Sequence, residues 1–219
     1  MKNVPSLAAS IVALCFVAGS GLAQGQSPQK PSQPSDAQVQ AMQALAAAAS
    51  PGPAHADLMK RAGDYTTTAT FYAPGTEPQE STGTAKLTSI LGGRFLEEEN
   101  SGVSFGQPYS GLRLYGYNNG SKQYEAIWIY DGSTAVLVLD GTTEDSGKTV
   151  RYSGAFIGPN SEKETLRVTI TQQDADHFSV KLLGEAPGSG TSTLETVYTR
   201  TKKTAAAHPV PRCGSVSRR

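Results

Sequence analysis

Residues 91–130, LGGRFLEEENSGVSFGQPYSGLRLYGYNNGSKQYEAIWIY, decide the fold of this chain. Short stretches of alternating apolar and polar residues are separated here by glycines and by the pair Asn119-Gly120. Alternation with a period of two is typical of β-strands that bury one face, and Asn-Gly is a strong hairpin signal. The block therefore predicts consecutive antiparallel strands and shows no obvious active site.

The same period continues on both sides of this block, from Tyr65 to Arg200. Turn signals such as Asp131-Gly132 and Asp140-Gly141 separate about ten short strands, with no helix-length insertion between them. Regular spacing with hairpin turns favours an up-and-down antiparallel barrel over a Greek-key sandwich. The expected fold is all-β: one such barrel within residues 51–200, preceded by a short N-terminal helical segment. A membrane barrel is not expected, because the strands are short and aromatic girdles are missing.

The two ends of the chain differ in composition from the predicted barrel. Residues 1–23 have an early lysine, an apolar run and small residues before Ala23, which is the layout of a secretory signal peptide. Residues 24–50 predict a flexible linker with an Ala- and Gln-rich helix that Asp36 caps. A short helix over residues 54–61 is expected to plug or flank the barrel, and residues 201–219 to form a disordered basic tail.

The predicted signal peptide implies export to the periplasm or the medium, with signal cleavage near Ala23. Cys15 leaves with the signal, so Cys213 is the one thiol of the mature chain and no internal disulfide can form. Residues 24–200 carry 13 basic and 19 acidic residues, a net charge of −6. An acidic domain lacks the basic face that phosphate binding needs, so no nucleic-acid partner is expected. The apolar run before Ala23 is too short for a membrane anchor.

Several motifs resemble a bacterial domain-of-unknown-function family, number 1579. They are Pro51-Gly52-Pro53-Ala54-His55, Gly63-Asp64-Tyr65, residues 90–97, Gly106-Gln107-Pro108, Gly116-Tyr117-Asn118, Trp128 and residues 197–200. The resemblance covers residues 51–200 and implies a lipocalin-like or calycin-like barrel. It implies no activity, because the family has none established. Tyr65 stands where members often have tryptophan.

Residues for catalysis or metal binding are not arranged in any known pattern. His55, His177 and His208 have no metal-ligand spacing, and no Gly-x-Ser-x-Gly element precedes a predicted helix, as a strained nucleophile turn would require. The sequence therefore assigns no catalytic residue, no metal ligand and no cofactor. Catalysis is the less favoured alternative to binding.

Three consecutive acids, residues 97–99, bring at least one carboxylate toward the barrel interior or its mouth, whichever face of the strand turns inward. We take Glu97 and Glu99 to face inward, as polar anchors for a ligand. The alternative is a strand end with both faces in water.

The next hairpin offers a larger set of candidate ligand contacts. A two-residue turn at Asn119-Gly120 pairs Tyr117 with Lys122, Tyr115 with Tyr124 and Arg113 with Ala126. One face then collects residues with aromatic or cationic side chains, namely Arg113, Tyr115, Tyr117, Tyr124, Trp128 and Tyr130. Turned inward, this face would line a cavity for an amphipathic or anionic molecule; turned outward, it would leave a filled core and an exposed aromatic stripe. Small barrels of this shape commonly hold a ligand, which favours the cavity.

Three functions remain open at the level of sequence. The first is an exported protein that binds a small hydrophobic or amphipathic molecule. The second is a cell-envelope interaction module with a filled barrel. The third is an enzyme that uses a carboxylate in the same pocket. Neither the ligand nor the oligomeric state follows from the sequence.

Overall fold

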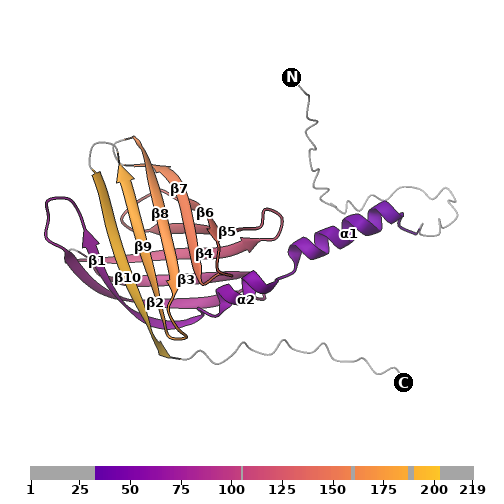
Figure 1. Cartoon of the computed structure of the whole chain (residues 1–219), viewed down its shortest axis with the longest axis horizontal. Coiled ribbons are helices and arrows are strands. Elements are labelled where there is room, and N and C mark those ends of the chain that lie inside the picture. The colour runs from indigo at the N-terminus through magenta and orange to yellow at the C-terminus, as the bar shows by residue number, and fades with distance from the viewer. Residues whose placement is uncertain (1–32, 105, 159–160, 187–189, 203–219) are drawn as a thin grey trace, which may run out of the picture.

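The computed structural model describes residues 33–104, 106–158, 161–186 and 190–202. Ten antiparallel strands form one closed barrel, in which strands that are consecutive in sequence pair with each other and β1 pairs with β10 (Figure 1). The strands are β1 (Gly63–Tyr72), β2 (Gln79–Ile90), β3 (Phe95–Ser104), β4 (Gln107–Asn118), β5 (Gln123–Tyr130), β6 (Leu137–Thr143), β7 (Thr149–Ile157), β8 (Lys163–Gln172), β9 (His177–Ala186) and β10 (Gly190–Lys202). The predicted up-and-down barrel with an N-terminal helical segment is confirmed. The turn predicted at Asp140-Gly141 is wrong, because both residues lie within β6 and pair with β5 and β7.

Closure of the barrel depends on the pairing of its first and last strands. Tyr65 lies opposite Arg200 and Tyr72 lies opposite Thr193, so nearly the whole of β1 is paired with β10. β1 also pairs with β2 along its length, from Gly63 opposite Leu87 to Phe71 opposite Gln79. Each of the ten described strands therefore has a paired neighbour on both sides, which removes the two open edges of a flat sheet.

The helix α1 (Asp36–Ala49) projects away from the barrel and buries none of its residues (Figure 1). Its N-cap is Ser35 rather than the predicted Asp36, because the Ser35 hydroxyl accepts a hydrogen bond from the backbone of Gln38. The Gln38 side chain accepts in return from the Ser35 backbone, which completes a capping box. No helix among the described residues is both long enough and apolar enough to cross a bilayer. The predicted signal peptide lies outside the described residues, and so does the predicted basic tail apart from Thr201 and Lys202, which belong to the last strand of the barrel.

The helix α2 (Pro53–Met59) closes one end of the barrel. Leu58 is 1% exposed and belongs to the main core, while His55 is buried and accepts a hydrogen bond from the Gly52 backbone at 3.0 Å. Pro53 suits the first helical turn because its missing N–H would have no partner there. The short helix predicted near these residues therefore covers the barrel end, where it lies against β3 and β4.

Replacing Leu58 by Ala is predicted to lower the free energy of unfolding by about 2–5 kcal/mol, because the side chain leaves a cavity between α2 and the barrel. Leu45→Ala provides a matched control, since Leu45 on α1 is 71% exposed and should change stability by less than about 0.5 kcal/mol. Urea denaturation followed by circular dichroism measures both. Equal losses in the two variants would contradict the assigned role of α2.

Candidate functional site

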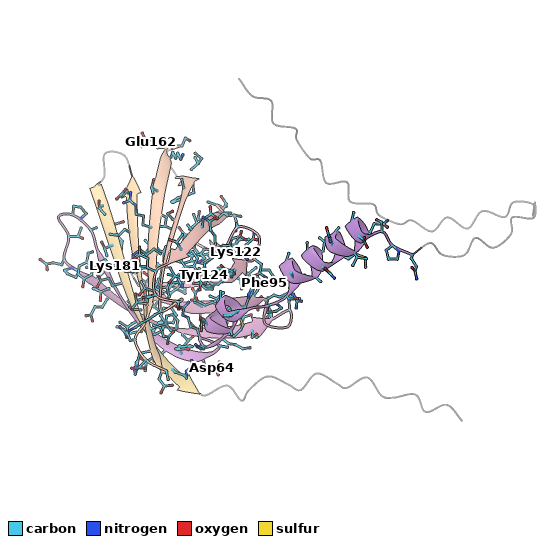
Figure 2. The ribbon with its side chains drawn as sticks, turned by 45° about the vertical axis from the view of Figure 1, so that its right-hand side comes forward. Asp64, Phe95, Lys122, Tyr124, Glu162 and Lys181 are labelled. Carbon is cyan, nitrogen blue, oxygen red and sulfur yellow. The ribbon has the colours of Figure 1, made fainter. Side chains whose placement is uncertain are left out.

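Half of the barrel is filled and half is hollow. The hollow half is a cavity of about 540 Å³ lined by residues from all ten strands. It lies at the end of the barrel that carries the β1–β2, β3–β4, β5–β6, β7–β8 and β9–β10 connections, opposite α2. Figure 2 shows these two ends: Glu162 lies in the β7–β8 connection at the open end, and Asp64 lies at the start of β1 at the other. The volume is within the range typical of small-molecule sites, roughly 300–1,000 Å³.

The division into two halves follows from side-chain size. Inward positions around the cavity are often small, including Thr67, Ala69, Ser81, Gly111, Gly184 and Thr196. Inward positions of the filled half carry large apolar or aromatic groups, including Tyr65, Leu87, Leu96, Tyr124, Tyr152, Ile170 and Phe178. Since a barrel of fixed strand number has a nearly constant width, small side chains leave space that large ones fill.

A row of three inward residues on adjacent strands lies where the two halves meet. Glu98 of β3 is directly opposite Arg113 of β4, and Arg113 is directly opposite Trp128 of β5. The Arg113 Nη1 lies 2.8 Å from Glu98 Oε1, and its guanidinium carbon lies 4.4 Å from the centre of the Trp128 ring. The register of three strands thus produces a buried ion pair stacked on an indole.

The Glu98 carboxylate accepts hydrogen bonds from four polar side chains. Its Oε1 accepts from Arg113, from the Tyr198 hydroxyl at 2.9 Å and from the Asn100 amide at 3.4 Å. Its Oε2 accepts from the Tyr115 hydroxyl at 3.0 Å. Glu98 is 1% exposed, and a carboxylate that is buried to this degree requires such partners.

We call Asn100, Arg113, Trp128 and Tyr198 the floor, because these residues line the cavity at its boundary with the filled half. Burial lowers the pKa of the Arg113 guanidinium, but the adjacent Glu98 carboxylate raises it, and the result lies well above the ordinary value. Burial, together with the charge of Glu98, raises the pKa of Tyr115 and Tyr198. Near neutral pH the floor therefore holds a charged arginine and a protonated tyrosine.

The predicted contact residues are distributed over both halves of the barrel. Arg113 and Trp128 line the cavity. Tyr115 lies inside the barrel and donates to Glu98, but it is not part of the cavity wall. Tyr117 and Tyr124 pack on each other with ring centres 5.0 Å apart, and Tyr117 also packs on His55 of α2. These two tyrosines therefore lie at the closed end.

The register predicted for this hairpin is wrong by two residues. The strands are joined by four residues, because the Asn118 side chain accepts from the backbones of Gly120 and Ser121 and Lys122 adopts a positive φ of 60°. Tyr117 therefore faces Tyr124, Tyr115 faces Ala126 and Arg113 faces Trp128. A shift of two preserves which side chains share a face. The set from Arg113 to Trp128 accordingly points inward, whereas Tyr130, at the end of β5, is 47% exposed. The exposed stripe includes the aliphatic residues Leu112, Ile127 and Ile129.

The prediction that Glu97 and Glu99 face inward is also wrong. Leu96, Glu98 and Asn100 are the buried positions of β3, while Glu99 is exposed and Glu97 is only partly covered. Phe95, which shares the outer face of β3 with Glu97 and Glu99, lies over Gly116, where an added Cβ would come within 2.9 Å of its ring. A glycine opposite an aromatic residue thus allows Phe95 to pack on the outer surface. Glu99 instead borders a shallow depression on the outside of the barrel.

Three residues of the site were not predicted as contacts: Glu98, Asn100 and Tyr198. Leu96, Glu98 and Asn100 alternate along β3 and share one face, so the apolar Leu96 was a signal that this face turns inward. The sequence left the choice between the two faces of β3 open. Tyr198 carried no such signal, because its contact with Glu98 joins positions 100 residues apart. Within the described residues, no group of three or more His, Cys, Asp or Glu side chains is placed to hold a metal ion.

Comparison with protein families identifies the chain. The model of the family described as a protein of unknown function, DUF1579, matches residues 50–200. The chain belongs to this family. No curated protein matches this DUF1579 chain in sequence.

Solved structures share the barrel of this DUF1579 protein at low sequence identity. An S-type phycobiliprotein lyase from Guillardia theta is 10% identical with a TM-score of 0.51, over 66% of this chain and 90% of that one. The protein Rv2717c from M. tuberculosis is 17% identical with a TM-score of 0.51, over 70% of this chain and 100% of that one. These likenesses establish a shared fold.

Five of the nine tyrosines are predicted to make stability depend on alkaline pH. Burial raises the pKa of Tyr65 to about 12 and also raises the pKa of Tyr115, Tyr124, Tyr152 and Tyr198. Tyrosines of the unfolded chain ionise near pH 10, so above that pH unfolding releases protons that the folded barrel retains. The free energy of unfolding should be insensitive to these groups below about pH 10 and fall between about pH 10 and 12. Urea unfolding across this interval, with tyrosinate absorbance recorded in parallel, measures the effect; a constant free energy would contradict it.

Proposed function

We propose that this DUF1579 protein is an exported binding protein that holds one small hydrophobic or amphipathic molecule in its cavity. The observation that carries the proposal is the hollow half of the barrel, with apolar walls above a polar floor. Leu137, Phe156, Leu166, Leu182 and Leu194 contribute the apolar walls. A molecule with a long apolar body and one polar end is complementary to such a site.

Export is part of the proposal and is supported by the signal-like pattern of residues 1–23. A ligand-binding protein of the periplasm or the medium would begin near Gln24 after cleavage. The intact mass of the protein recovered from an exporting host tests this point, and an uncleaved Met1 in the exported fraction would contradict it.

Catalysis is a weaker interpretation of the same cavity. A general base needs a lone pair that faces the substrate, whereas both oxygens of Glu98 already accept hydrogen bonds inside the protein. The raised pKa of Tyr198 keeps its hydroxyl protonated, so it is a poor base near neutral pH. The fold shared with a phycobiliprotein lyase supplies no reaction for this chain, since fold alone does not determine function.

The interaction module considered from the sequence required a filled barrel with an aromatic stripe outside. The cavity of about 540 Å³ argues against a filled barrel, and the inward aromatic residues argue against an aromatic stripe outside. Binding inside the barrel therefore remains the function that the geometry favours.

Ala69→Phe is predicted to abolish ligand retention while the barrel stays folded, because a phenyl group at this inward position would occupy the cavity. Native mass spectrometry of gently purified protein from an exporting host should show a non-covalent adduct on the wild type and none on the variant. Thr68→Phe is the matched control, since Thr68 is exposed on the outer face of the same strand. An adduct that survives Ala69→Phe, or a wild type that binds nothing from a lipid extract, would contradict the proposal.

A further inference from the structure

The floor has hydrogen-bond donors that the protein itself does not use. Nη1 of Arg113 donates to Glu98 and Tyr198, while its Nε and Nη2 have no acceptor among the described residues. A guanidinium carries five N–H groups, so about three of them remain available. The Arg113 side chain is 20% exposed and lines the cavity, so these groups are within reach of a ligand.

Trp128 adds a second unused donor at the same boundary. Its Nε1 is buried and has no hydrogen-bond partner among the described residues, although the residue is only 4% exposed. Buried indole N–H groups usually have an acceptor, and leaving one without a partner costs free energy. The Tyr152 hydroxyl in the filled half is buried without a partner in the same way, so the indole alone does not indicate a ligand. The free Arg113 donors, which line the cavity, indicate a ligand that supplies a hydrogen-bond acceptor.

The charge of the floor is already balanced. The charged residues that line the cavity are Arg113 and, near its open end, Asp131, and Glu98 lies directly behind Arg113. The Glu98 carboxylate neutralises the guanidinium at 2.8 Å, and Asp131 adds a further negative charge. A carboxylate or sulfonate on a ligand would therefore find no unpaired cation, and its desolvation would not be repaid.

A cationic ligand is disfavoured by the hydrogen bonds of Glu98. Four donors already occupy its two oxygens, and it is 1% exposed. An ammonium group at the floor would have the Asn100 amide oxygen as its remaining acceptor there. An uncharged acceptor such as a carbonyl oxygen satisfies the free donors without adding a charge.

We propose that the ligand is an uncharged amphipathic molecule whose carbonyl, ester or amide oxygen accepts from Arg113, and that Glu98 makes the cavity reject anions. This inference rests on the proposed binding function. It reverses the expectation that an inward arginine selects an anionic ligand, because the register of β3 and β4 places a carboxylate directly against that arginine. Glu98 is thus a specificity-determining residue that does not itself line the cavity.

Two fluorescent probes with the same aromatic frame test the inference on the wild-type protein. N-phenyl-1-naphthylamine is uncharged, and 1-anilinonaphthalene-8-sulfonate carries one sulfonate. The uncharged probe is expected to bind at least about tenfold more tightly, which corresponds to one decade in the dissociation constant. Only the fluorescence that Ala69→Phe removes is counted, so that binding outside the cavity does not enter the comparison.

Glu98→Gln tests the assigned residue, because it keeps the side-chain shape and leaves the charge of Arg113 unbalanced. The preference for the uncharged probe should fall by about tenfold or reverse. Glu97→Gln is the matched control, since it removes the same charge one position away on the outer side and should leave the preference unchanged. If Glu98→Gln does not fold, the wild-type comparison still decides the ligand class.

The outcomes separate this inference from the proposed function. Equal binding of both probes in the cavity, or tighter binding of the sulfonate, would overturn the inference and leave the binding function standing. A wild-type preference that Glu98→Gln does not alter would overturn the role of Glu98. If neither probe enters the cavity, the inference fails, and the proposed function is then decided by the native mass spectrum of the wild type and Ala69→Phe.

Discussion

The ion pair between Glu98 and Arg113 is the constraint on which the arrangement of the barrel interior depends. Two opposite charges lie inside a closed barrel, where an unpaired charge would cost several kcal/mol. Tyr115 and Tyr198 donate to the carboxylate, and Trp128 covers the guanidinium. These partners come from β3, β4, β5 and β10, so the pair joins both sides of the barrel to each other. The same group of residues ends the filled half and begins the cavity.

Side-chain volume and the helix α2 determine what surrounds this pair. Large residues fill the barrel between the pair and α2, and Leu58 of α2 completes their packing. Small residues on the other side leave the cavity, so the barrel has one closed end and one open end. The filled half supplies the stability that the hollow half does not, because apolar burial is the main favourable term in folding. A ligand site and a stable core therefore coexist within one sheet.

The fold was predictable from the sequence because alternation and turn residues are local signals. The inward face of β4 and β5 was also predictable. Arg113, Tyr115 and Trp128 stay on the same face of the hairpin when its loop is two residues longer than predicted, because side chains alternate with a period of two. The inward face of β3 was not, because alternation defines two faces without deciding which one turns inward. The outward Phe95 packs on Gly116, and this contact joins two strands, so the residues of β3 alone did not show it. The bond between Tyr198 and Glu98 likewise exists only once β10 closes the barrel on β1.

The central claim is that half of the barrel is hollow and that a ligand entering it reaches Arg113 and Trp128. Trp128 is the one tryptophan of the chain, so 5-fluorotryptophan places a single fluorine at the floor. The most direct measurement is the ¹⁹F NMR spectrum of this labelled protein with and without saturating N-phenyl-1-naphthylamine. A shifted or new resonance in the wild type, absent in Ala69→Phe, is the predicted result. An unchanged resonance at saturation would contradict the account.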